Sequence, residues 1–319
     1  MAVSSGMSTA IVYTAFGGPE VLTVSDIAVP APGRGQLAVR VEAAGVNPID
    51  HKLRAGLRAS DPITEPRRVG SDAAGVVTAV GDDVEGFRVG QPVVVFGVSG
   101  AYASDLVVAA ANAVPRPPQV SAAEGASLGV PVGTAYQTLR SLAVGADDTV
   151  LIHGGSGAVG QAAIQHAVLA GAAVLATTSD GRADRVRSLG ATPLPYGPEV
   201  VERVRALAPQ GVTVAIDLAG TDEALAQSLA LAPDRSRIAT LVRGKDAAGL
   251  GIRAFSGGSP TPLTGREQQW RAEAIPGTLA LLAAGRFSVE IGPRLAPADA
   301  AEGPRLVATG TAGKIVLLP

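Results

Sequence analysis

Hydrophobic and polar positions follow two different patterns of spacing along the chain. From about Ala10 to Pro118, short apolar runs rich in β-branched residues are separated by Gly, Pro and Asp. Examples are QLAVRVEAAGV and GVVTAVGDDVEGFRVGQPVVVF. Runs bounded by turns at a spacing of about 8–12 positions are typical of short antiparallel strands. This part of the chain is therefore predicted to be a barrel-like β domain.

The spacing changes after the proline-rich stretch VPRPPQV at Val114–Val120, which is stiff and marks a boundary. The next segment, SAAEGASLGVPVGTAYQTLRSL, has helical spacing, and Ser121 with Glu124 forms a capping-box pattern. Strand patterns then alternate with helix patterns: strands TVLIH, AAVLATT, VTVAIDL and SRIATLV, and helices from Ala158, at Arg182–Leu189 and at Glu223–Leu231. Such alternation predicts a parallel, doubly wound α/β sheet of the Rossmann type.

The end of the chain carries one more helix pattern, EAIPGTLALLAAGRF, and a last strand pattern, GKIVLLP. We interpret this tail as a return to the first domain. The predicted organisation is a Rossmann domain of residues 121–265 inserted into a β-rich domain of residues 7–120 and 266–319.

The amino-acid composition limits the classes of function that the protein can have. The 319 residues are enough for two domains, each with its own core. A formal net charge of −2 gives no electrostatic footprint for nucleic acid or an acidic membrane. The absence of cysteine excludes disulfides, iron–sulfur clusters and thiolate zinc sites. No signal-peptide pattern and no apolar run of about 18 residues is present, so a cytoplasmic protein is expected.

The stretch HGGSGAVG contains Gly155, Gly157 and Gly160 in the spacing G-x-G-x-x-G, directly between a predicted strand and a predicted helix. That context is the one a dinucleotide-binding turn requires. The first glycine would allow the tight turn, the second the approach of a pyrophosphate, and the third close helix packing. The helix N-terminus would then offer N–H groups to phosphate. The alternative is an ordinary glycine-rich turn.

The end of the second strand points to the type of dinucleotide. An NAD site usually carries an acidic residue there for the ribose hydroxyls. Here Thr177, Thr178 and Ser179 occupy that place, and Arg182 follows three residues later, where a guanidinium suits a 2′-phosphate. NADPH is therefore favoured. Asp180 is the opposing observation, although it also fits as a helix cap, and Arg182 could instead belong to a solvated helix face.

Over nearly its whole length the chain resembles the zinc-independent medium-chain dehydrogenase/reductases of the quinone oxidoreductase type. The matching stretches are YTAFGGPEVLTV, VEAAGVNPIDHKLRAG, GSDAAGVVTAVGDDVEGFRVGQPVV, GTAYQTL, HGGSGAVG and GKIVLLP. The resemblance implies an NADPH-binding Rossmann domain within a split, β-rich, GroES-like catalytic domain. It also implies a homodimer, and an open sheet edge near GIRAFSG would favour pairing of two copies.

Zinc-dependent relatives place a cysteine where GVNPID stands and a His-Glu pair where Ser71 and Asp72 stand. None of those ligands is present, and His51, His153 and His166 lack ligand-like spacing. Without a Lewis acid to hold an alkoxide, hydride transfer is easiest to an acceptor that spreads its charge. Quinones and α,β-unsaturated carbonyls are such acceptors, since hydrogen-bond donors can hold the resulting enolate-like oxygen.

By resemblance, Asn47 and Asp50 lie beside the nicotinamide and Lys52 follows on the same turn. Asn47 would donate to the substrate carbonyl, Lys52 would do the same or hold the cofactor, and Asp50 either takes part or only braces its loop. Tyr102 and Tyr136 are alternative proton donors, although packing is the more ordinary role. Together with the glycine turn, the cofactor-binding set is Thr134, Gly155, Ser156, Gly157, Ala158, Val159, Thr178, Ser179, Arg182, Tyr196, Leu241 and Phe255.

The leading hypothesis is an NADPH-dependent reductase of quinones or related conjugated carbonyls. An enoyl reductase acting on an enone or enoyl thioester is the first alternative. A non-catalytic NADPH-binding protein is the second, because a fold does not fix a function.

Overall fold

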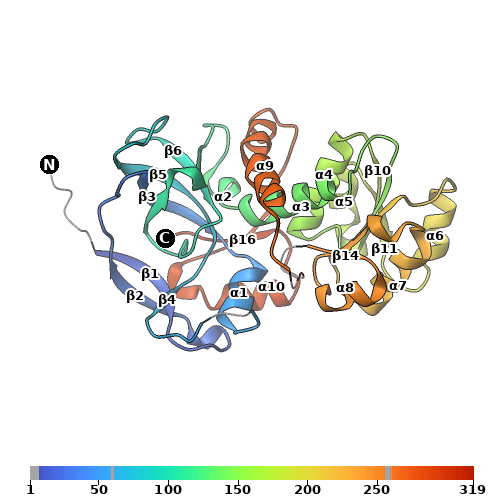
Figure 1. Cartoon of the computed structure of the whole chain (residues 1–319), viewed down its shortest axis with the longest axis horizontal. Helices are drawn as coiled ribbons and strands as arrows, with labels where there is room; N and C mark the ends of the chain where they lie inside the picture. The colour runs from blue at the N-terminus through green and yellow to red at the C-terminus, as the bar shows by residue number, and fades with distance from the viewer. Residues whose placement is uncertain (1–6, 59–60, 256–258, 260) are drawn as a thin grey trace. The chain divides into compact units, whose positions relative to one another are not determined.

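The computed structural model describes residues 7–58, 61–255, 259 and 261–319, and the chain divides into two compact units (Figure 1). The β-rich unit comprises Met1–Val130 and Ile275–Pro319, and the Rossmann unit comprises Pro131–Ala274. The domain borders predicted at residues 121 and 265 stay a prediction, because compactness does not show which segment folds by itself.

The β-rich unit contains two sheets. One has the strand order β2-β1-β4, and the other the order β15-β16-β3-β5-β6-β8, with β7 also paired to β3. The strands are β1 (Met7–Tyr13), β2 (Thr23–Ala28), β3 (Gln36–Gly45), β4 (Arg67–Arg68), β5 (Asp72–Val80), β6 (Pro92–Phe96), β7 (Asp105–Ala109), β8 (Ala113–Pro115), β15 (Ile291–Leu295) and β16 (Lys314–Leu317). The helices are α1 (Pro48–Arg54), α2 (Ala122–Gly125) and α10 (Glu302–Ala308).

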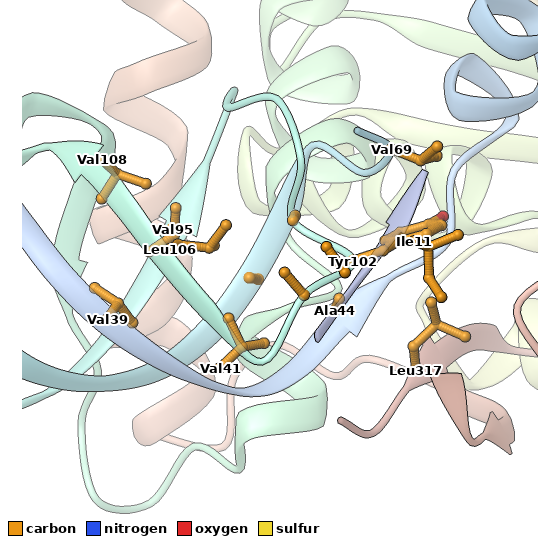
Figure 2. Packing of buried hydrophobic residues seen from close by; sticks show 14 of the residues in the cluster. Ile11, Val39, Val41, Ala44, Val69, Val95, Tyr102, Leu106, Val108 and Leu317 are labelled. Atoms are coloured by element: carbon orange, nitrogen blue, oxygen red, sulfur yellow. The ribbon is translucent and has the colours of Figure 1, made fainter. Parts of the chain in front are cut away.

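Alternation of side chains builds the core of this unit. In β3, Leu37, Val39 and Val41 are buried while Arg40 and Glu42 between and beyond them are exposed, as expected of an antiparallel strand with one solvated face. Figure 2 shows Val39 and Val41 within the buried cluster, which also includes residues from the other sheet and from the C-terminal strand. The antiparallel β domain is confirmed.

The last strand returns to the first domain, as predicted from GKIVLLP. β16 pairs antiparallel with β3, with Val316 opposite Gly45 and Leu317 opposite Ala44. This pairing places Lys314, at the start of β16, in the same unit as the segment that follows β3. The C-terminus is thereby part of the structure around that segment.

The Rossmann unit is built on six parallel strands in the order β11-β10-β9-β12-β13-β14. Their bounds are β9 (Thr149–His153), β10 (Ala173–Thr178), β11 (Thr192–Pro195), β12 (Val214–Asp217), β13 (Ile238–Thr240) and β14 (Arg253–Ala254). The helices are α4 (Ala158–Leu169), α5 (Ala183–Ser188), α6 (Val200–Leu207), α7 (Asp222–Leu231) and α8 (Gly244–Leu250). All five residues of the central strand β9 are buried, as both faces of a doubly wound sheet are covered.

The helices and strands predicted from the sequence are largely confirmed, but the elements β11, α6, α8, β15 and α10 were not among the predicted segments. Three of the predicted segments also differ from the structure. The helical stretch after Val120 is two helices, α2 and α3 (Gly129–Ser141), and the capping box of Ser121 and Glu124 opens the first of them. The tail helix α9 (Gly265–Ala283) begins before the predicted segment. The stretch after Asn47, predicted as a turn, is the helix α1, with Pro48 at its first position, where a missing N–H costs nothing.

Strand β14 is the last strand in the order of the six-stranded sheet, so within the described residues it is an edge strand. Positions 256 and 257 of the segment GIRAFSG, predicted to form the sheet edge, lie outside the described residues. No helix in the described ranges is both long and apolar enough to cross a membrane.

Candidate functional site

The glycine-rich turn joins β9 to α4 in the Rossmann unit. Gly154 has a φ of +82°, so the residue of the turn in the left-handed conformation is Gly154, which precedes the three glycines of the predicted motif. A Cβ on Gly155 would lie 2.6 Å from the Ala176 Cβ, and one on Gly160 would lie 2.3 Å from the Gly154 carbonyl oxygen. Both positions therefore need glycine for close packing of the turn, α4 and β10.

The turn leaves the N-terminus of α4 accessible. Gly157 is the N-cap residue, and Gly157 and Ala158 are exposed, while Ser156 and Val159 are half-buried. The first N–H groups of a helix have no partner within the helix, and they carry the positive end of its dipole. The Gln161 side chain donates to the Ser156 carbonyl at 2.8 Å and fixes the turn from below. An anion would find backbone donors here.

The carboxyl end of β10 lies against this turn. The Thr177 hydroxyl accepts a hydrogen bond from the Gly154 N–H at 3.1 Å, so its side chain supports the turn. The Thr178 hydroxyl is buried and has no hydrogen-bond partner among the described residues. The Tyr196 N–H donates to the Thr178 carbonyl at 3.3 Å, and the Tyr196 side chain is 68% exposed. Thr178 and Tyr196 are thus brought together by the pairing of β10 with β11.

A single 3₁₀ turn, Asp180–Arg182, follows β10 and precedes α5. The Arg182 N–H donates to the Ser179 carbonyl at 2.9 Å, which folds Arg182 back toward Ser179. Both side chains are half-buried, whereas Asp180 is exposed. Asp180 does not cap α5, since the N-cap position of that helix is Arg182, so the capping role predicted for Asp180 is wrong.

A row of polar side chains supports the same edge of the sheet, and two of its members, Asp217 and Thr240, were not predicted from the sequence. The register places Thr177, His153, Asp217 and Thr240 side by side on β10, β9, β12 and β13. The Asp217 carboxylate accepts from the Thr240 hydroxyl at 2.7 Å and from the Ala219 and Gly220 N–H groups at 3.0 and 2.8 Å. Burial lowers the pKa of His153 to about 4, so its imidazole is neutral.

Asp217 and Thr240 fix the loops that carry two predicted cofactor residues. The Leu241 N–H donates to the Asp217 carbonyl at 3.0 Å, and the Phe255 N–H donates to the Thr240 carbonyl at 3.2 Å. Leu241 and Phe255 therefore lie near each other at the carboxyl ends of β13 and β14. Thr134, on α3, is buried, and its hydroxyl accepts from the Arg271 guanidinium at 2.9 Å.

The β-rich unit holds a second group of functional residues, which we call the polar cluster: Asn47, Asp50, Ser71, Asp72, Tyr102 and Lys314. Asn47 is the N-cap residue of α1 and is 2% exposed. Its side-chain amide donates to Asp72 at 2.9 Å and to the Gly45 carbonyl at 3.2 Å, and its amide oxygen accepts from the Lys314 ammonium. Both amide hydrogens have acceptors within the unit, so donation to a substrate would require breaking one of these bonds.

The Asp50 carboxylate accepts hydrogen bonds from three donors. Its Oδ2 accepts from the Asn47 N–H at 2.9 Å and from the Tyr102 hydroxyl at 2.8 Å, and its Oδ1 accepts from the Ser71 hydroxyl at 3.1 Å. Burial raises the pKa of Asp50 to about 6, although the hydrogen bonds from Tyr102 and Asn47 oppose that shift. The carboxyl group therefore changes protonation close to neutral pH.

Tyr102 enters the cluster from the hydrophobic core. Its ring belongs to the buried cluster with Ile11, Ala44 and Val69 (Figure 2), and a Cβ on Gly70 would lie 2.3 Å from the ring. Burial raises the pKa of Tyr102 well above its ordinary value, and the adjacent Asp50 adds to the shift. The phenol is therefore neutral and is held as a donor to Asp50.

Lys314 and Asp72 are the remaining charges of the cluster. The Lys314 ammonium donates to the Val46 carbonyl at 2.6 Å and to Asn47, and burial lowers its pKa to about 8. Asp72 accepts from the Val130 N–H at 2.8 Å, and burial raises its pKa while Lys314 opposes that effect. From the sequence, Ser71 and Asp72 were considered only in relation to zinc, and Lys314 was not predicted to belong to the site.

Lys52 lies apart from this cluster. It is half-buried on α1 and makes no hydrogen bond or ion pair with the cluster in the described part of the chain. Burial lowers its pKa, and Arg58 adds to the shift. The structure thus brings together Asn47 and Asp50 of the predicted catalytic residues, but not Lys52.

The side chains of the polar cluster can be compared with the ligands that a zinc ion requires. Asn47, Ser71 and Asp72, the positions compared with zinc ligands, do converge, but the Lys314 ammonium lies among them. The Asn47 amide is fully hydrogen-bonded, and no histidine or cysteine belongs to the set. Within the described ranges no group of three or more His, Cys, Asp or Glu residues could hold a metal ion. These residues do not fit a zinc ion.

Two family models match the chain. Residues 33–118 match the alcohol dehydrogenase GroES-like domain, and residues 158–251 match the domain named zinc-binding dehydrogenase. Human quinone oxidoreductase is 40% identical over 187 residues, which is 57% of this chain and 56% of the human protein. The chain thus aligns with little more than half the length of that relative.

Solved structures match over nearly the full length. A mycobacterial quinone oxidoreductase is 31% identical with a TM-score of 0.78, and the match covers 98% of this chain and 100% of the other. The quinone oxidoreductase of Escherichia coli in complex with NADPH is 25% identical with a TM-score of 0.82 at the same coverage. The fold and the glycine turn define a medium-chain dehydrogenase/reductase. Within that class, the chain belongs to the quinone oxidoreductase family.

Proposed function

We propose that the protein is an NADPH-dependent reductase that transfers hydride to quinones or related conjugated carbonyls without a metal. The observation that carries this proposal is the carboxyl edge of the Rossmann sheet, where a glycine turn opens α4 beside a β10 that ends without an acidic residue. The names of the relatives, and the NADPH bound to the Escherichia coli protein, support it.

The residues at this edge suit the parts of NADPH. The glycine turn and the start of α4, from Gly155 to Val159, with Gly157 and Ala158 exposed, would hold the pyrophosphate with backbone N–H groups. Ser179, Arg182 and Tyr196 would hold the adenosine 2′-phosphate, because a guanidinium and hydroxyl donors favour a doubly charged group. Thr178 is proposed to belong to the same site, since its buried hydroxyl has no hydrogen-bond partner among the described residues. Leu241, Phe255 and Thr134 are proposed to line the remaining part of the cofactor site.

When bound, NADPH supplies a hydride. The protein groups in the β-rich unit then have to stabilise negative charge on the carbonyl oxygen of the acceptor. The polar cluster offers the hydroxyl of the half-buried Ser71 but no set of zinc ligands, so an acceptor that spreads its charge by conjugation fits it best. On this basis Asp50 is a proposed catalytic residue, whereas Asn47 and Lys52 are proposed as catalytic from the family resemblance alone.

A substrate panel tests the proposal. NADPH oxidation is followed with quinones, enones and enoyl thioesters, and faster turnover of quinones or simple enones is expected. Preference for enoyl thioesters would favour an enoyl reductase. Tight NADPH binding without turnover of any acceptor would indicate a non-catalytic NADPH-binding protein. A homodimer and a cytoplasmic location remain proposals from the sequence.

A further inference from the structure

Reduction of a conjugated carbonyl consumes a proton as well as a hydride. As the hydride adds, an electron pair moves to the carbonyl oxygen, and that oxygen must then be protonated. A positioned side chain speeds such a proton transfer by roughly 10²–10⁴-fold. On the basis of the function proposed above, we propose that Asp50 supplies this proton through the hydroxyl of Ser71.

Exposure within the polar cluster singles out Ser71. The other members are nearly inaccessible, with exposed fractions of 2% for Asn47, 5% for Asp50 and Lys314, 3% for Tyr102 and 0% for Asp72. Ser71 is half-buried, so it is the most exposed member of the cluster and the one we assign to meet the acceptor. Its hydroxyl lies 3.1 Å from Asp50 Oδ1, which is hydrogen-bond distance for proton exchange.

The two oxygens of Asp50 have different surroundings. Oδ2 is held by the Asn47 N–H and the Tyr102 hydroxyl, whereas Oδ1 faces Ser71. A proton on Asp50 is therefore directed to Oδ1 and toward the serine. The titratable and charged groups that face Asp50 are Tyr102, Asp72 from β5 and Lys314 from β16. Tyr102 and Lys314 favour the carboxylate, so they stabilise Asp50 after it has lost its proton.

The proposed proton transfer consists of two linked steps. The Ser71 Oγ–H bond breaks as its proton passes to the reduced oxygen of the acceptor, and the Asp50 Oδ1–H bond breaks as its proton passes to Ser71 Oγ. The acceptor has then gained a hydride and a proton, with the nicotinamide as the reductant. Asp50 is left as a carboxylate and regains a proton from water through Ser71 after the product leaves.

The step requires protonated Asp50, which gives the rate a defined pH dependence. Since the pKa of Asp50 is about 6, kcat should fall as the pH rises through about 6. Tyr102→Phe removes a hydrogen bond that favours the carboxylate, so it should raise the pKa of Asp50 and move this fall to higher pH. Asp50→Asn should abolish the fall together with most of the rate.

The test compares Ser71→Ala, Ser71→Thr and Tyr102→Phe with wild type at saturating NADPH, using an acceptor found in the panel. Ser71→Ala should lower kcat by about 10²-fold with little change in KM, and Ser71→Thr, which keeps the hydroxyl, should restore kcat. Ser104→Ala is the matched control, because Ser104 is a half-buried serine of the same unit that bonds Ser8. It should keep wild-type kcat.

The protonation of Asp50 is measured separately, in the protein without acceptor, by the infrared band of its carboxylic acid. A band that titrates near pH 6 and is missing in Asp50→Asn supports the proposal, and its absence at pH 5 overturns it. Should Asp50→Asn fail to fold, Tyr102→Phe moves the band instead. Wild-type kcat in Ser71→Ala, or a fall that stays in place in Tyr102→Phe, also overturns the proposal. Absence of any turnover by wild type would instead refute the proposed function.

Discussion

Replacing Arg182 by alanine is expected to weaken NADPH binding while leaving NADH binding unchanged. Arg182 is folded back toward Ser179 by the 3₁₀ turn after β10, and Tyr196 is tied to the end of the same strand through Thr178. A 2′-phosphate at this position would be met by the guanidinium. NADH lacks the phosphate, so its binding provides an internal reference.

The magnitude follows from the type of bond and from its exposure. A hydrogen bond to a charged group contributes about 1.5–3 kcal/mol, which corresponds to a roughly ten- to hundredfold change in Kd. Because Arg182 is half-buried, solvent screens part of the interaction, and the lower end of that range, about tenfold, is expected. Turnover at saturating NADPH should persist, since the 2′-phosphate is remote from the transferred hydride.

The assay is the Kd of both cofactors for wild type, Arg182→Ala and the control Arg187→Ala. Arg187 is an exposed arginine of α5, paired with Asp184, and its loss should leave both Kd values unchanged. Equal losses for NADPH and NADH in Arg182→Ala would refute the reasoning and give Arg182 a structural role. Tighter binding of NADH than of NADPH by the wild type would indicate that Asp180 contacts the ribose, and it would refute the assignment of NADPH as the cofactor.

Three further results are expected. Extended dialysis against a strong chelator should leave activity intact, and a loss that zinc restores would contradict our interpretation of Ser71 and Asp72. Gly160→Ala should lower the stability of the fold by about 1–3 kcal/mol in thermal unfolding, because its Cβ would meet the Gly154 carbonyl, whereas Gly181→Ala, with open space around it, should not. Light scattering should show a homodimer at micromolar concentration, and a monomer alone would remove that proposal.

Contiguous features of the site could be predicted from the sequence. The glycine turn needs only a strand, closely spaced glycines and a helix start in that order, and all three lie within a few residues of one another. The alternation of strands and helices likewise predicted the order β9, α4 and β10 correctly. The sequence did not show which glycine takes the positive φ, because Gly154 and Gly155 are adjacent and only the backbone path distinguishes them.

The polar cluster could not be predicted, because its members come from four separate segments of the chain. Lys314 contacts Asn47 because β16 pairs with β3, and these two strands are far apart in the sequence. A signal was present in GKIVLL, where a lysine directly precedes an apolar run and must be either at a strand end or buried. The same holds for Asp72, an acidic residue at the start of the apolar strand β5, which is fully buried.

The structure also changes how the two sequence-based roles of Asp50 relate to each other. Bracing the loop and taking part in the reaction were alternatives, and under our proposal the carboxylate would do each with a different oxygen. Oδ2 braces the start of α1 through the Asn47 N–H, and Oδ1 faces the half-buried Ser71. Asn47, in contrast, has its amide hydrogens and its oxygen all engaged within the unit, which fixes it as the rigid support. A reacting oxygen near this cluster would therefore meet Ser71 before it met Asn47.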